Sequence, residues 1–264
     1  MENYNKLWRS FFLAGMIAIA VQQLICADFR PVILPAGFPA WLSHRVVWTW
    51  IFSIALIITA LLMLAGIGAR TKALLWGTIL LLLVILCQVP SVLTGVNSAK
   101  HLGLWIDPFK ELTLSGGFFV VAGSLSGGNN APGPIKFLEK LIPAGKYFLA
   151  ITMVVFGYSH FLYTDFVATL VPGWIPGHLF WTYFAAVALI LSGLAIILNI
   201  QRRTAAALLG IMLFLWVIVL HIPRAITDPH SGNGNEWTSV FEALAFSGIA
   251  FIIAGKTNSL KNKP

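Results

Sequence analysis

Residues 27–39 read ADFRPVILPAGFP and residues 164–176 read TDFVATLVPGWIP, so both stretches carry an Asp-Phe pair and a Pro-x-x-x-Pro spacing. Further matches follow in the same order along the chain. They are Arg70-Thr71 then Gly77 with Arg203-Thr204 then Gly210, QVP at 88–90 with HIP at 221–223, Trp105, Phe109 and Leu112 with Trp237, Phe241 and Leu244, and SGGFFVVAG at 115–123 with SGIAFIIAG at 247–255. This ordered agreement predicts a tandem duplication.

The duplication divides the chain into two units of similar length. The first unit covers residues 1–125 and the second covers residues 144–264. The linker at 126–143 begins with SGGNNAPGP, which is rich in residues that interrupt regular structure.

The composition is that of a polytopic membrane protein, because 58% of the residues are hydrophobic and only 10% are charged. Apolar runs of membrane-helix length fall at about 9–27, 46–67, 73–90, 108–124, 145–164, 179–199, 204–223 and 237–255. The N-terminal run has no small-x-small cleavage site, so it is interpreted as a retained span. The expected fold is all-α transmembrane, with eight spans arranged as two parallel-repeat four-helix bundles.

The basic residues predict the orientation of these spans. With eight spans both termini lie on one side of the membrane, and that side collects 12 of the 17 Lys and Arg residues. By the positive-inside rule the N and C termini are expected to be cytoplasmic, in the inner (cytoplasmic) membrane. The lipid bilayer is therefore the expected partner of the basic loops, and nucleic acid is not.

The other titratable residues gather on the opposite, outer side, which holds all six histidines and seven of the nine acids. The second unit has His160 and His221 where the first has Gln23 and Gln88. With Glu242 these histidines are expected to line an outward-open cup.

Tyr158, Asp165 and Arg224 are expected nearer the membrane surface around this cup. Two histidines and a carboxylate can relay protons, bind a metal or hydrogen-bond a quinone carbonyl. The spacing matches no known metal motif, so no metal is assigned. The alternative is that these polar groups satisfy one another and fix helix packing.

Two further features of the sequence each have two interpretations. The apolar, Pro-rich segments after the first and fifth spans are expected to lie at the membrane interface over each bundle, as lids or as anchors. Cys26 and Cys87 fall near one layer at the outer side, where they form either a dithiol or two buried small hydrophobic residues.

The second unit resembles the DoxX-like family of bacterial membrane proteins. The likeness rests on G-x-x-H-F at 157–161, DFV at 165–167, WIPGH at 174–178, HIPR at 221–224 and NEW at 235–237, and it extends more weakly to the first unit. It implies a four-helix membrane bundle and a role in redox systems, some of them linked to quinones. It supplies no catalytic residues.

The leading hypothesis is the membrane subunit of a redox-linked system, which binds a small hydrophobic or quinone-like ligand at the outer end of the second bundle. A periplasmic or membrane redox partner is then expected. The first alternative is a non-catalytic scaffold that docks such a partner through its outer loops. The second is a small-solute transporter, which the repeats favour but the apolar inner halves of the spans do not.

Overall fold

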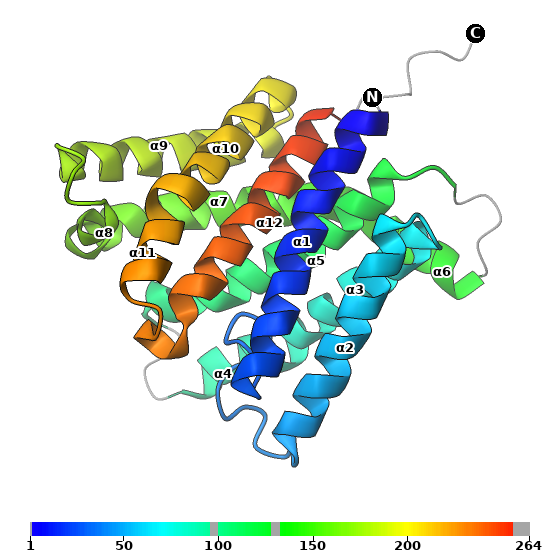
Figure 1. Cartoon of the computed structure of the whole chain (residues 1–264). Helices are drawn as coiled ribbons and strands as arrows, with labels where there is room; N and C mark the ends of the chain where they lie inside the picture. The colour runs from blue at the N-terminus through cyan, green and yellow to red at the C-terminus, as the bar shows by residue number, and fades with distance from the viewer. Residues whose placement is uncertain (1, 96–99, 128–132, 256–264) are drawn as a thin grey trace, which may run out of the picture.

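The structure is a computed structural model that describes residues 2–95, 100–127 and 133–255, and this part of the chain is helical without strands (Figure 1). Residues 128–132 of the expected linker and the basic tail at 256–264 lie outside the described residues. The all-α prediction is confirmed for the described ranges.

The helices follow one another in the same order in the two halves of the chain. The first half contains α1 (Glu2–Cys26), α2 (Arg45–Leu64), α3 (Ala69–Leu83), a π-helical turn (Val84–Gln88), α4 (Val89–Thr94), a 3-10 turn (Leu102–Trp105) and α5 (Ile106–Ser124). The linker forms α6 (Gly133–Leu138) and a 3-10 turn (Glu139–Ala144). The second half contains α7 (Gly145–Leu162), α8 (Thr164–Leu170), α9 (His178–Ile197), α10 (Arg202–Trp216), a π-helical turn (Val217–His221), α11 (Ile222–Thr227), a 3-10 turn (Ser231–Asn233) and α12 (Asn235–Gly255).

Seven segments of the described chain are long and apolar enough to cross a membrane, which fits a multi-pass membrane protein. They are Tyr4–Cys26, Arg45–Leu64, Ala69–Thr94, Gly133–Leu162, His178–Ile197, Arg202–Thr227 and Ser231–Gly255. The eighth expected span, at 108–124, forms helix α5 but is not among them. Its N-terminal end carries Asp107, Lys110 and Glu111, which lower its apolar character.

Helices α5 and α12 form the centre of the bundle, and both are buried along most of their length. Helix α1 packs on α12, α7 packs on α5 and α9, α10 packs on α12, and α3 packs on α5 (Figure 1). Small residues allow this close packing. A Cβ atom on Gly116 would lie 2.7 Å from the carbonyl oxygen of Gly145, so α5 and α7 approach each other directly.

The two π-helical turns each end two residues before a proline, at Gln88 before Pro90 and at His221 before Pro223. A proline has no N–H to donate to the preceding helical turn, and the wider π turn accommodates the altered hydrogen bonding. Gln88 and His221 therefore occupy the last position of equivalent turns.

The segment after α1 does not lie over the bundle as expected but enters it. Ala27 has a left-handed backbone conformation (φ 52°) that turns the chain, and residues 29–34, here called the plug, follow. Arg30, Val32 and Ile33 of the plug are at most 2% exposed. The expectation of an interfacial segment is wrong for the plug, which has its own polar anchor, whereas Trp41 of the same segment stays 78% exposed.

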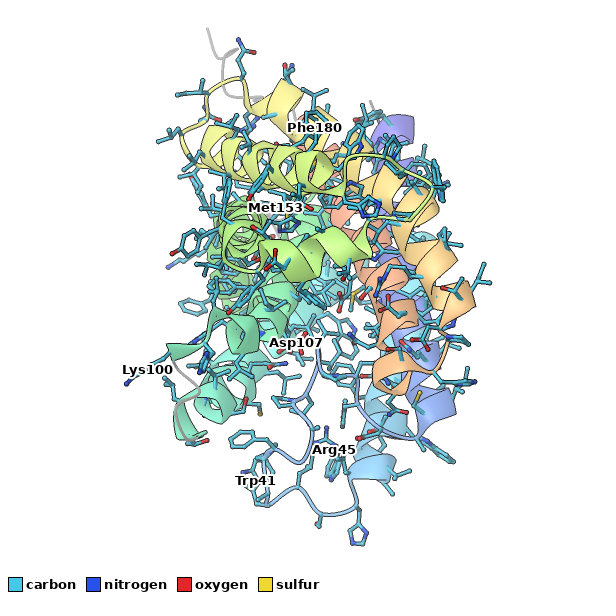
Figure 2. All side chains as sticks on the ribbon, turned by 90° about the vertical axis from the view of Figure 1, so that its left-hand side faces the viewer. Trp41, Arg45, Lys100, Asp107, Met153 and Phe180 are labelled. Atoms are coloured by element: carbon cyan, nitrogen blue, oxygen red, sulfur yellow. The ribbon has the colours of Figure 1, made fainter. Side chains whose placement is uncertain are left out.

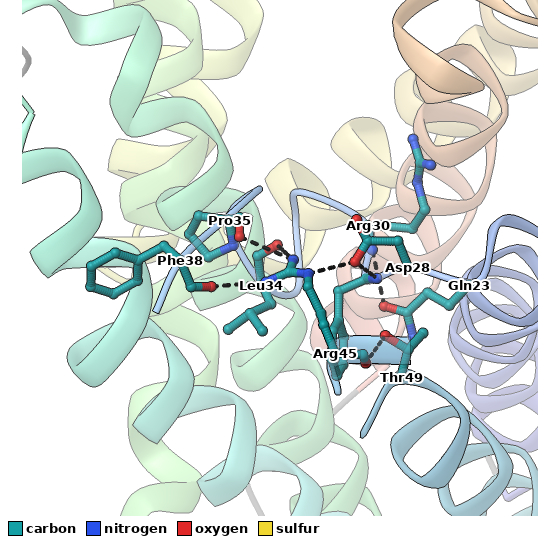
Figure 3. Close-up of polar contacts among 9 residues, drawn as sticks. Gln23, Asp28, Arg30, Leu34, Pro35, Phe38, Arg45 and Thr49 are labelled. Atoms are coloured by element: carbon teal, nitrogen blue, oxygen red, sulfur yellow. Dashed lines mark hydrogen bonds and ion pairs between the residues drawn. The ribbon is translucent and has the colours of Figure 1, made fainter. Parts of the chain in front are cut away.

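That anchor is Arg45, the first residue of α2 (Figure 3). Its guanidinium pairs with the carboxylate of Asp28. It also donates hydrogen bonds to the carbonyl oxygens of Leu34, Pro35 and Phe38, at 3.1, 3.0 and 3.0 Å. One half-buried cation thus holds both ends of the plug.

The corresponding segment of the second half takes a different path. Residues 164–170 form α8, since this stretch has Ala168 where the plug has Pro31. Phe166 is 66% exposed, whereas Phe29 is 7% exposed. The segment therefore lies outside the helices of its own half.

Candidate functional site

A cavity of about 970 Å³ opens in the second half, between α7, α8 and α9 on one side and α10, its π turn and α12 on the other. We call it the trough. Figure 2 turns this side of the molecule toward the viewer, with Met153 of α7 and Phe180 of α9 labelled. Its walls are mainly apolar and include Met153, Ala185, Leu189, Leu209, Leu213 and Trp216.

The trough brings together four polar side chains from four helical elements. His160 comes from α7, His221 from the π turn, Glu242 from α12 and Lys110 from α5. Lys110 Nζ lies 3.0 Å from Glu242 Oε2 and 3.5 Å from Asp107 Oδ1. The Glu242 side chain is 5% exposed, so this ion pair closes the trough against the centre of the bundle.

His160 has one ring nitrogen already occupied. Its Nδ1 lies 2.7 Å from the carbonyl oxygen of Phe156, which can only accept a hydrogen bond. Nδ1 therefore carries a proton, and in the neutral ring Nε2 is left as an acceptor. The imidazole also stacks on Trp216, with ring centroids 6.5 Å apart and planes at 18°.

His221 has a different environment. Within the described part of the chain its ring makes no hydrogen bond, although it lines the trough. The charges that act on it are those of Lys110, Glu236 and Arg224. Both ring nitrogens therefore remain for a ligand or for water.

Three residues predicted for the site do not line the trough. Tyr158 is 54% exposed and Asp165 lies exposed on α8. Arg224 donates two hydrogen bonds to the carboxylate of Glu236, at 2.6 and 3.1 Å. His160, His221 and Glu242 are the predicted residues that the structure brings together.

Sequence reasoning missed Lys110, which belongs to the other unit. A signal for it was present, because Trp105 and Phe109 match Trp237 and Phe241, and this alignment pairs Lys110 with Glu242. In the structure these two residues of opposite charge form the ion pair between α5 and α12.

Neither a metal site nor a disulfide forms in the described ranges. No group of three or more His, Cys, Asp or Glu side chains there is arranged to hold a metal ion. Cys26 and Cys87 are both free thiols, and Cys26 Sγ lies 3.7 Å from a guanidinium nitrogen of Arg30.

A family model described as a domain of unknown function (DUF8561) matches residues 149–246. No curated protein and no solved structure matches the chain. The matched range runs from α7 into α12 and includes His160, His221 and Glu242, so the second half, and the trough within it, is similar to that family.

Proposed function

We propose that the chain is a multi-pass protein of the cytoplasmic membrane whose second four-helix unit binds a small hydrophobic or quinone-like ligand in the trough. The observation that carries the proposal is the trough itself, about 970 Å³ of mainly apolar space with His160, His221 and the Lys110–Glu242 pair at one end. Ligand pockets of roughly 300–1,000 Å³ with apolar walls and a few convergent polar groups are typical of small-molecule sites.

Several packing features support the proposal of two repeated four-helix units. The first helix of each unit packs on the last helix of the other, as α1 does on α12 and α7 on α5. The π turns end at equivalent positions, Gln88 and His221. Lys110 and Glu242 match in the repeat and contact each other, as residues beside a two-fold axis do.

The charge distribution supports cytoplasmic termini for such a pair of units. The first turn of α3 carries Arg70 and Lys72, and the first turn of α10 carries Arg202 and Arg203. In the eight-span arrangement, both positions follow an even number of spans. They therefore lie on the same side of the membrane as the N-terminus. The trough polar groups then face the periplasmic half of the membrane.

The redox role rests on the resemblance to the DoxX-like family and on the chemistry of histidine. A quinone that gains two electrons and two protons turns two carbonyl groups into hydroxyls, so its hydrogen-bond partners must exchange donor and acceptor roles. An imidazole makes this exchange by moving a proton between its nitrogens and the solvent, whereas the amide of Gln23 or Gln88 has fixed roles. The electrons would come from a periplasmic or membrane redox partner.

Native mass spectrometry with an absorption spectrum, on protein extracted gently from its own membrane, tests the proposal. The wild type is expected to carry a stoichiometric apolar ligand that the double variant His160→Leu/His221→Leu lacks. Tyr158→Leu is the matched control, because this residue is on the same helix as His160 but outside the trough. An apo mass for gently extracted wild type contradicts the proposal.

A further inference from the structure

The first unit shows how the space that corresponds to the trough can be filled. There the plug belongs to one buried cluster with Leu56, Trp76 and Leu80. In the repeat these three residues match Leu189, Leu209 and Leu213, which are walls of the trough. The trough therefore corresponds to the space that the plug fills in the first unit.

The polar groups at the end of this space also correspond. In the first unit Gln23 Oε1 accepts a hydrogen bond from the backbone N–H of Arg30, at 3.2 Å. Gln88 Nε2 donates to the carbonyl oxygen of Pro31, at 2.8 Å. The two glutamines therefore bind one donor and one acceptor of the plug backbone.

His160 and His221 stand where these glutamines stand. The free Nε2 of neutral His160 is an acceptor, which is the role of Gln23 Oε1. Among the residues that the structure describes, none hydrogen-bonds the His221 ring, so the ring can donate to a ligand, which is the role of Gln88 Nε2. The second unit keeps the binding groups of the first but not the chain segment that they bind.

The second unit also lacks what holds the plug. Arg45 begins α2, whereas His178 begins α9 and has no guanidinium to reach several carbonyl oxygens at once. The trough is also wider than the corresponding space in the first unit. The ring of Phe29 packs 5.5 Å from that of Phe52, and the residue that matches Phe52 is Ala185.

We propose, on the basis of the function proposed above, that the ligand takes the place and the hydrogen bonds of the plug. Its head carries a hydroxyl that donates to His160 Nε2 and a neighbouring oxygen that accepts from His221. Its tail is a methyl-branched hydrocarbon, because the plug fills this space with the branched side chains of Val32, Ile33 and Leu34. The class is a hydroxyl-bearing, methyl-branched amphiphile.

Equilibrium binding of radiolabelled geranylgeraniol to the protein in nanodiscs tests the hydroxyl. The matched probe is its methyl ether, which keeps the tail and cannot donate. Loss of one hydrogen bond is expected to weaken binding roughly tenfold. The ether is therefore expected to bind the wild type about tenfold more weakly than the alcohol does.

Two variants of one residue locate the acceptor. His160→Gln retains an acceptor, as Gln23 does in the first unit, and is expected to bind the alcohol within about threefold of the wild type, while His160→Leu loses roughly a factor of ten. The ether should not distinguish the two variants. If His160→Leu fails to fold, the alcohol and ether on wild-type protein still decide.

The outcomes separate this inference from the proposed function. The inference is overturned if the alcohol and the ether bind equally well, or if His160→Gln and His160→Leu lose the same affinity. The proposed function still stands in that case if native protein carries a bound ligand. Straight-chain 1-eicosanol binding as tightly as geranylgeraniol overturns the branched tail. Binding of neither probe, with an apo native protein, overturns both.

Discussion

Replacement of Lys110 by Met should destabilise the fold strongly, because it leaves a buried carboxylate without its cation. Lys110 Nζ lies 3.0 Å from Glu242 Oε2, and the two side chains are 14% and 5% exposed. The other carboxylate oxygen, Oε1, is buried and has no hydrogen-bond partner in the described part of the chain. Lys110→Met therefore removes the cation that is hydrogen-bonded to an almost fully buried carboxylate.

The size of the effect follows from the burial of the pair. Removal of one partner from a buried ion pair costs about 3–5 kcal/mol. Asp107 and Arg30 also act electrostatically on Glu242, in opposite directions, so the expected loss for Lys110→Met is about 3–5 kcal/mol. Replacement of both residues by Met removes both charges and should return the free energy of unfolding to within about 1–2 kcal/mol of the wild type.

Reversible unfolding in mixed micelles, by titration with sodium dodecyl sulfate, measures these free energies. The double-mutant cycle compares Lys110→Met, Glu242→Met and the double variant. Lys110→Glu with Glu242→Lys is the matched control, since it restores the pair in the opposite direction across the unit boundary. Additive losses in the double variant, or a loss below about 1 kcal/mol for Lys110→Met, would refute the reasoning.

Other consequences follow from the plug, the trough and the helix packing. Ala185→Phe should fill the trough and weaken ligand binding at least tenfold in the nanodisc assay, while lowering the unfolding free energy by no more than about 1–3 kcal/mol. Arg45→His should lower that free energy by roughly 2–4 kcal/mol, since the hydrogen bonds that hold the plug are charge-assisted. Gly116→Leu should cost at least about 3 kcal/mol, measured in the same titration, because its Cβ would meet the backbone of α7. Hydrogen exchange should be faster at residues 164–176 than at residues 27–39, and equal rates would contradict the difference in burial.

The helices were predictable from the sequence because membrane helices need only length and apolar composition. The path of the two inter-helix segments was less accessible. Pro31 against Ala168 explains why only the second segment continues as a helix. The anchor of the plug was not predictable. Arg45 contacts Asp28 and three backbone carbonyl oxygens, and every residue has such a carbonyl, so the sequence does not indicate which ones are bound.

The site residues were predicted from their depth along the membrane spans. Depth does not tell toward which side of the helix a side chain points. His160 and Tyr158 lie at similar depth, but two residues along a helix correspond to a turn of about 200°. Tyr158 therefore faces away from the trough that His160 lines. The structure supplies the missing direction for His160 and His221, and it agrees with the repeat, because Gln23 and Gln88 at the matching positions are buried and bind the plug.

The two units also differ in what each can do alone. In the first half the plug fills the space that corresponds to the trough, and the cavity beside Pro31 and Gln88 is about 200 Å³. The first half is therefore expected to support the second rather than to bind a ligand of its own. The first half also contributes a charged group to the trough, because Lys110 of α5 lines it and forms an ion pair with Glu242. A second unit produced without the first would carry the buried carboxylate unpaired. Ligand binding by the second unit is therefore expected to require the first, and the two units form one functional site.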